Sequence, residues 1–319
     1  MKLVYIIALG HSGSTLADCI LGSHPQIHSS GEMRYLQWQL KRTLSEEQSV
    51  ANQNVCSCGE KFRECSFWRS TIDLVSQKVS IDVSIEPMKF ETAFFDQAIY
   101  EGNGHIHRSL MDKAKTSLFR RYLQRGYPLR YVKWIEPKID KWINNNWLLY
   151  ESMSTVAQKP VIIDSSKHLT FALFLQQSRP KDVIFLFLHR SIEGLAASYK
   201  KRAQQKGKAF SIDEVVKRKR DFNVRINLCK KSIPNLSYLD ISYEEMAESP
   251  LKVLNNMAEV AGLKKLDSSG DVFKINPSEM HLVAGNPMRY LGEQTVQYDN
   301  RWRDRLTSEE KEYLKSIKV

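Results

Sequence analysis

The segment from residue 10 to residue 16 (GHSGSTL) combines glycines and hydroxyl residues in a pattern that can bind an anion. Gly10 and Gly13 allow the backbone to turn tightly and to approach a ligand closely. Ser14 and Thr15 open a predicted helix, whose first N–H groups carry about half a positive charge from the helix dipole. Such a helix start favours a phosphate or sulfate group. The segment lacks the Lys of the ATP-type loop, so an ordinary strand-turn-helix with a serine cap is the alternative interpretation.

A second candidate phosphate anchor lies in the middle of the chain. Arg190 follows a predicted strand at 183–188, and Ser198 lies eight residues further on, in a predicted helix. Open parallel sheets bind ligands at the carboxyl ends of their strands, which is where Arg190 is expected. Its guanidinium can donate two parallel hydrogen bonds to a phosphate, and Ser198 can add a third. The alternative is that Arg190 pairs with a nearby carboxylate such as Glu193.

Together these two features resemble the family of sulfotransferases that use 3'-phosphoadenosine-5'-phosphosulfate (PAPS). The resemblance implies that residues 10–16 bind the 5'-phosphosulfate and that Arg190 and Ser198 bind the 3'-phosphate. It also implies a P-loop-like sulfotransferase fold, with PAPS as co-substrate and PAP as product.

Further segments are similar to bacterial and tyrosylprotein members of that family. They are residues 22–33 (GSHPQIHSSGEM), 161–167 (VIIDSSK) and 281–289 (HLVAGNPMR), with Trp302 thirteen residues beyond the last. The resemblance misses most of residues 34–158. The cofactor-binding residues that it implies are Gly10, His11, Ser12, Gly13, Ser14, Thr15, Arg190, Ser198, Gly285, Asn286 and Arg289.

Sulfuryl transfer needs a base for the acceptor hydroxyl and a cation for the charge that grows on the leaving phosphate oxygen. The resemblance implies Glu32 as the base, although a purely structural role for Glu32 is the alternative. His168 and Asp164 are further candidates for the base, and so is His11. Many family members have Lys or Arg in place of His11, which is a cation only when protonated. Lys167 is the alternative cation.

Three of the five cysteines are close together in the sequence, as Cys56-x-Cys58-Gly59 and Cys65. Three thiols at this spacing could bind zinc. No fourth ligand follows at the spacing of a zinc finger. We therefore expect a packed turn at Gly59 and no metal. The remaining two cysteines stand alone in apolar, helix-like stretches and are expected to be free thiols.

The predicted elements define an α/β protein. Short apolar runs typical of buried strands alternate with helical stretches, which predicts a central parallel sheet flanked by helices. These runs are residues 3–9, 160–163, 183–188 and 236–241. Residues 34–158 show helical spacing without a clear strand and predict a helical insertion that shapes the acceptor site. We expect a single domain over residues 1–319.

The charge of the chain is consistent with an anionic ligand. Lys and Arg total 47 against 36 Asp and Glu, a net charge of +11, which attracts polyanions. Basic runs at 200–208 and 217–220 can guide such a ligand, or are simply solvated helix faces. The chain has no apolar run approaching the roughly 18 residues of a membrane span. We expect a cytoplasmic protein without a nucleic-acid partner.

The function predicted on these grounds is transfer of a sulfuryl group from PAPS to a hydroxyl or an amine. A small natural product, a glycan and a tyrosine are all candidate acceptors. The rival hypotheses are a nucleotide kinase-like phosphate-loop enzyme and a basic nucleic-acid-binding protein. The first should carry a lysine in its loop, and the second should bind DNA or RNA with a steep dependence on salt.

Overall fold

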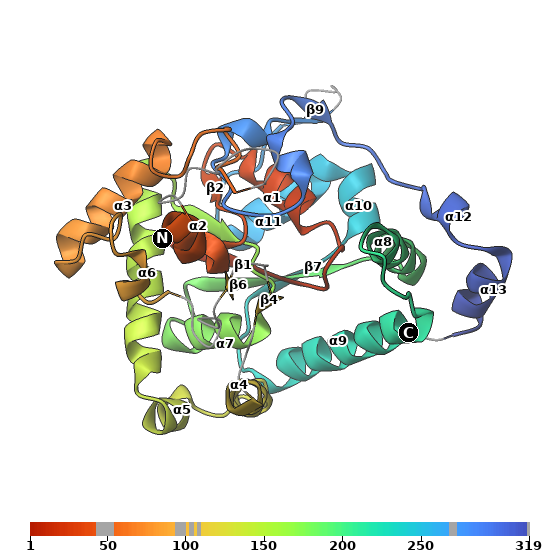
Figure 1. Cartoon of the computed structure of the whole chain (residues 1–319), viewed down its shortest axis with the longest axis horizontal. Helices are drawn as coiled ribbons and strands as arrows, with labels where there is room; N and C mark the ends of the chain where they lie inside the picture. Colours follow the sequence, from red (N-terminus) through yellow and green to blue (C-terminus); the bar gives the residue numbers. More distant parts are fainter. Residues whose placement is uncertain (43–53, 93–99, 102–104, 107–109, 268–272, 318–319) are drawn as a thin grey trace.

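Five strands form a central parallel sheet in the computed structural model (Figure 1). The structure describes residues 1–42, 54–92, 100–101, 105–106, 110–267 and 273–317. In spatial order the strands are β2 (Ile27–Ser29), β5 (Val161–Asp164), β1 (Lys2–Ala8), β6 (Val183–His189) and β7 (Tyr238–Ser242). Every residue of β1 after Lys2 is buried, because helices cover both faces of the sheet. This double burial explains the continuous apolar runs in the sequence. The predicted central parallel sheet is confirmed.

Side chains of β1 alternate between two hydrophobic cores. Val4 and Ile6 pack in the core beneath α1 (Ser14–Gly22), α10 (Tyr243–Glu248) and α11 (Pro250–Ala261). Leu3 and Tyr5 pack in the opposite core, with α6 (Lys138–Ala157), α7 (Leu169–Ser178) and α9 (Ile212–Ser232). Figure 1 shows these two helical layers on either side of the strands. Within the described residues, no helix combines the length and apolar character needed to cross a membrane.

The segment between β2 and β5 is the helical insertion. Its helices are α2 (Leu36–Arg42), α3 (Ser66–Val79), α4 (Leu110–Leu123), α5 (Leu129–Ile135) and α6, with short 3-10 turns at Met33–Tyr35 and Pro87–Lys89. The insertion also contains β3 (Tyr100–Glu101) and β4 (His105–Ile106), which pair as an antiparallel hairpin that the sequence did not indicate. Two-residue strands are too short to show a period of two in the sequence.

The C-terminal part of the chain packs against α8 and against the start of α1. Helix α8 (Ile192–Gln205) packs against α12 (Trp302–Arg305) and α13 (Ser308–Ser316), and all three share a small hydrophobic core. Between α11 and α12 the chain forms β8 (Lys274–Ile275), paired with β9 (Gln294–Thr295), and 3-10 turns at Pro277–Glu279 and Pro287–Tyr290. We call residues 277–290 the tail segment.

The sheet topology explains the position of the site. Because all five strands are parallel, their carboxyl ends lie along one edge of the sheet. The residues that follow β1, β2, β5 and β6 therefore meet there, although they are far apart in sequence.

Candidate active site

Residues 10–16, which we call the phosphate loop, comprise the turn after β1 and the first residues of α1, and they have the geometry of an anion-binding turn. Gly13 has φ +91°, and a Cβ there would lie 2.6 Å from Cδ2 of Tyr243, so only glycine fits. His11 is also left-handed, at φ +66°. Among the described residues, no side chain caps the start of α1, whereas Ser191 caps α8 and Thr307 caps α13. The first N–H groups of α1 are therefore left for a ligand.

Lys167 connects this loop to Glu32. Its Nζ donates to Oγ of Ser14 at 3.0 Å and to Oε1 of Glu32 at 2.6 Å. The Lys167 and Glu32 side chains are only 18% and 15% exposed, so water screens their attraction weakly. Lys167 has φ +63°, and this left-handed turn directs its side chain toward α1.

The buried carboxylate of Asp164 shapes the turn that carries Lys167. It accepts hydrogen bonds from the backbone N–H of Ser166 at 2.8 Å and from the Tyr150 hydroxyl at 2.6 Å. Burial raises the pKa of Asp164. Both of its oxygens are occupied, so Asp164 positions this turn. The other candidate base, His168, stacks on Phe171 at 4.0 Å between ring centroids, at the start of α7.

Arg190, directly after β6, reaches back over the loop. Its Nη1 donates to the His11 carbonyl oxygen at 2.8 Å and to Oγ of Ser198 at 3.3 Å. The guanidinium lies over the ring of Tyr243, 4.2 Å from its centroid. Nε of Arg190 is buried without a hydrogen-bond partner among the described residues. A buried donor of this kind is costly unless a ligand accepts from it.

His11 is uncharged at neutral pH in this environment. Burial lowers its pKa to about 4, and the nearby positive charges of Arg202 and Arg190 act in the same direction. A neutral imidazole cannot balance charge on a leaving phosphate. Within the described part of the chain, Lys167 and Arg190 are the cations that donate hydrogen bonds to the phosphate loop.

The tail segment contacts the helix that starts at the loop. The backbone N–H of Asn286 donates to Oγ1 of Thr15 at 2.9 Å. Gly285 has φ +135°, and a Cβ there would lie 2.8 Å from the same oxygen. Arg289 is 1% exposed, and its guanidinium donates to the Leu282 carbonyl oxygen at 3.0 Å and to the Tyr290 hydroxyl. These two bonds of Arg289 brace the tail segment itself.

Two positions that support the candidate site escaped the sequence analysis. Asp18 in α1 accepts hydrogen bonds from Ser29 Oγ at 2.6 Å and from Ser165 Oγ at 2.5 Å, which joins α1 to the ends of β2 and β5. Its only sequence signal is a charge inside an apolar helix. Gly194 lies under Arg190, since a Cβ there would be 2.7 Å from Nε of Arg190. A glycine four residues after the arginine was the available signal.

The structure thus brings most of the predicted residues to one edge of the sheet. The phosphate loop, Glu32, Lys167, Arg190 and Ser198 are linked by direct contacts, and the tail segment joins them through Thr15. A parallel sheet with a glycine loop after its first strand, and an arginine after a later strand, is an arrangement typical of α/β proteins that bind phosphorylated ligands.

The comparison with known proteins specifies the family. Residues 4–267 match the profile described as "Sulfotransferase family". The chain therefore belongs to the sulfotransferase family, as the motifs predicted, and the reaction of that family is sulfuryl transfer. No curated protein matches the sequence at a significant level.

Several solved sulfotransferase structures align with this chain at low sequence identity. The sulfotransferase domain from the curacin biosynthetic pathway is 14% identical, with a TM-score of 0.44 over 100% of this chain and 92% of that chain. The sulfotransferase domain of the olefin synthase from Synechococcus PCC 7002 is 15% identical, with a TM-score of 0.41 over 99% and 88%. A sulfotransferase from Mycobacterium tuberculosis H37Rv is 15% identical, with a TM-score of 0.42 over 83% and 68%.

Proposed function

We propose that the protein transfers a sulfuryl group from PAPS to a hydroxyl or an amine of an acceptor molecule. The observation that carries the proposal is the buried, unpartnered Nε of Arg190, held beside Ser198 at the phosphate loop. A nucleotide with a single phosphate chain needs only the loop. A second anion-binding group across the loop suits a donor that carries a separate 3'-phosphate.

Each residue of the site has a distinct part in this reaction. The start of α1 binds the 5'-phosphosulfate through its first N–H groups and through Ser14. Lys167, which contacts Ser14, stabilises negative charge on the phosphate oxygen from which sulfur departs. Glu32 accepts the proton of the acceptor hydroxyl. Lys167 donates to Oε1 of Glu32, so the acceptor hydroxyl can donate to Oε2 of the same carboxylate while the ion pair stays in place.

The helical insertion is the natural source of acceptor specificity. It begins directly after Glu32, so its first residues border the proposed base. Variable segments on a rigid scaffold often determine which substrate is accepted. Candidate acceptors are a small natural product, a glycan and a tyrosine, and a screen with radiolabelled PAPS would identify the class.

Calorimetric titration tests the donor assignment. We expect PAP to bind the native protein and ATP with magnesium to bind much more weakly, because the loop has no lysine. Arg190→Ala should weaken the binding of PAP by roughly 10- to 150-fold, because it removes about 1.5–3 kcal/mol of charge-assisted hydrogen bonding. Adenosine 5'-phosphosulfate, which lacks the 3'-phosphate, should bind both proteins alike.

A matched control is Arg179→Ala, which removes an arginine paired with Glu151 outside the site. Equal weakening of PAP and adenosine 5'-phosphosulfate by Arg190→Ala would show that Arg190 is not the 3'-phosphate anchor. Tight binding of ATP with magnesium would support the kinase-like hypothesis. Binding of DNA that PAP does not displace would support the nucleic-acid-binding hypothesis.

A further inference from the structure

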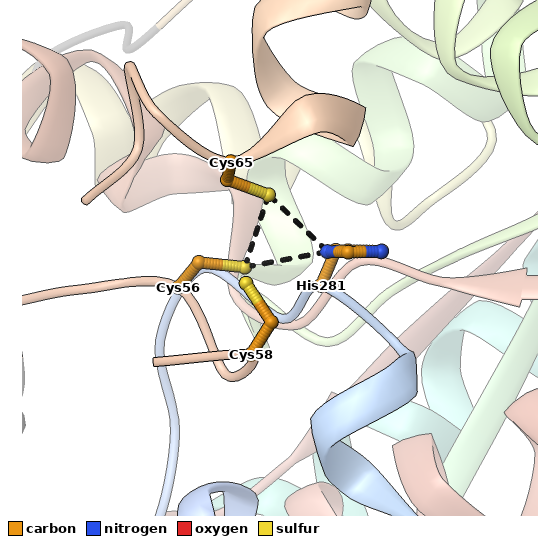
Figure 2. Close-up of side chains that lie close together, drawn as sticks. All are labelled: Cys56, Cys58, Cys65 and His281. Atoms are coloured by element: carbon orange, nitrogen blue, oxygen red, sulfur yellow. Dashed lines mark hydrogen bonds between the residues drawn. The ribbon is translucent and has the colours of Figure 1, made fainter. Parts of the chain in front are cut away.

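Three thiols and one imidazole converge between the helical insertion and the tail segment (Figure 2). They belong to Cys56, Cys58, Cys65 and His281. We call these four side chains the Cys3His cluster. Their ligand atoms all lie within 4.8 Å of one another. The fourth member that the local spacing of the cysteines lacked is thus supplied from more than two hundred residues away.

We propose that the Cys3His cluster is a structural zinc site, which binds one ion and fastens the insertion to the tail segment. Three thiolates and one imidazole form a common ligand set of closed, tetrahedral zinc sites. All four positions are filled by protein, so no ligand position is left for substrate. The role is therefore structural, and it is separate from the sulfuryl transfer proposed above.

The distances within the cluster fit ligands of one metal ion, and its three cysteines are free thiols in this structure. The Sγ atoms of Cys56 and Cys65 are 3.6 Å apart, whereas a disulfide requires about 2.05 Å. With Zn–S bonds of about 2.3 Å, two sulfurs of a tetrahedral site lie roughly 3.8 Å apart. Nδ1 of His281 lies 3.2 Å from Sγ of Cys65 and 3.7 Å from Sγ of Cys56, which is again the spacing of ligands that share one ion.

The backbone around the cysteines is shaped to bring their sulfurs together. Gly59 has φ +91°, and its N–H donates to the Cys56 carbonyl oxygen at 2.9 Å. This tight turn places the first two thiols on one side, as Figure 2 shows. Cys65 starts α3 as its N-cap residue, but its side chain does not cap that helix. Cys56 and Cys65 are completely buried.

His281 is held in an orientation that its backbone alone would disfavour. Its φ is +57°, a left-handed conformation that costs energy in a residue other than glycine. Trp68 Nε1 donates to its carbonyl oxygen at 2.8 Å, and Phe67 stacks on its ring at 5.2 Å between centroids. The first contact fixes the backbone of His281 and the second fixes the plane of its ring, so Nδ1 is held toward the thiols.

The charge of the surroundings also suits the bound form. Zinc displaces the thiol protons, so three thiolates and one Zn²⁺ leave the site with one net negative charge. The buried guanidinium of Arg289 lies close enough to Cys56 for electrostatic attraction. The negative charge of the metal site would offset part of the desolvation cost of the buried Arg289 guanidinium.

Metal analysis of the full-length chain, purified without a metal-affinity tag, tests the proposal. We expect about one zinc per chain in the native protein and less than about a fifth of that in Cys56→Ser, Cys65→Ser and His281→Asn. Cys229→Ser is the matched control, because it removes a buried cysteine of α9 outside the cluster. The control should keep the zinc of the native protein.

A second readout covers the case in which the variants fail to fold. Removal of zinc from the native chain by a chelator should lower the melting temperature. Addition of cobalt(II) should then give the thiolate charge-transfer and intense d–d bands of a tetrahedral site. A folded native chain that takes up neither metal would overturn the proposal. So would zinc retained in all three variants, or an intact mass two hydrogens short, which indicates a disulfide.

Discussion

At the scale of single residues, the contact between Lys167 and Glu32 matters most. The two side chains are opposite in charge and mostly buried, and Lys167 also contacts Ser14 of the phosphate loop. An ion pair of this kind holds both groups in position before substrate arrives, so that little reorganisation is needed during the reaction.

Glu32→Gln tests the basic role. Glutamine keeps the size of the side chain and can still accept a hydrogen bond from Lys167, but it cannot accept a proton. We expect unchanged PAP affinity and a turnover lower by about 10²–10⁴ with an aliphatic alcohol acceptor. Steady-state kinetics and calorimetry measure the two quantities. Glu293→Gln, which alters an exposed carboxylate paired with Lys274, should leave both unchanged.

Two outcomes would contradict the assignment of Glu32. Turnover within about threefold of native would mean that another group takes the proton. Loss of PAP binding together with turnover would mean that Glu32 supports the loop structurally. An acidic phenol or an amine needs less help from a base, so the alcohol acceptor is the informative one.

Because Asp18 is buried, we expect the free energy of unfolding to depend on pH. Burial raises its pKa in the folded protein from 3.8 to about 7. Between these values the unfolded chain has lost a proton that the folded protein retains. The free energy of unfolding therefore falls as pH rises through this window. Asp18→Asn cannot ionise, so the variant should gain about 3 kcal/mol relative to native between pH 5 and pH 8.

Urea unfolding at the two pH values measures this difference. The control is Asp267→Asn, which removes an exposed carboxylate. Its free energy of unfolding relative to native should be nearly the same at both pH values. If the difference between Asp18→Asn and native stayed constant with pH, Asp18 would be ionised in the folded protein at both pH values.

At the scale of elements, the start of α8 positions the proposed 3'-phosphate anchor. Ser191 caps the helix by accepting from the N–H of Gly194. The missing side chain at Gly194 leaves room for Arg190 to fold back over the loop. Lys219 in α9 also fixes the backbone at this position, since its Nζ donates to the Arg190 carbonyl oxygen at 2.6 Å.

Gly194→Ala should displace the Arg190 guanidinium without unfolding the helix. The new Cβ would also lie 2.9 Å from the capping Oγ of Ser191. Alanine favours a helix over glycine by about 1 kcal/mol, which offsets the cost of a weakened cap, so the loss should appear in binding rather than in stability. We expect roughly tenfold weaker PAP binding by calorimetry, equivalent to about one charge-assisted hydrogen bond. In an Arg190→Ala background the same change should have no further effect. Full additivity of the two substitutions would show that Gly194 acts elsewhere.

At the scale of the whole molecule, the tail segment closes over a loop that is about 270 residues earlier in sequence. The hydrogen bond from Asn286 to Thr15 spans a separation of 271 residues. The tail also pairs with the end of β2, because the Val283 N–H donates to the Ser30 carbonyl oxygen at 3.0 Å. Integrity of the site therefore depends on the fold of the complete chain.

Gly285→Ala tests this closure. A Cβ at φ +135° is strained and would approach Thr15 Oγ1 to 2.8 Å, so the tail should move away from α1. We expect a lower melting temperature and weaker PAP binding, by roughly tenfold, in a thermal-shift titration. Gly292→Ala is the control, because nothing lies within 4 Å of a Cβ there. Equal behaviour of the two variants would show that the tail does not support the loop.

Much of the fold and part of the site could be predicted from short stretches of sequence. The buried strands, the glycine loop at residues 10–16 and the Arg190–Ser198 spacing depend on residues within about ten positions of one another. Glycine turns, apolar runs and helix starts act over that range, because backbone sterics and burial on both faces of the sheet set them locally. The family followed from these same local patterns.

The tertiary structure alone decided which distant residues meet. Lys167 reaches Glu32 across 135 positions, and His281 joins Cys65 across 216. The three cysteines looked like an incomplete metal site, because the fourth member of the Cys3His cluster, His281, lies in the tail segment and comes near only when the chain folds. Chain separation places no limit on contact once parallel strands end at the same edge, so local spacing could not reveal these partners. Burial, which makes His11 neutral, is likewise a property of the packed molecule.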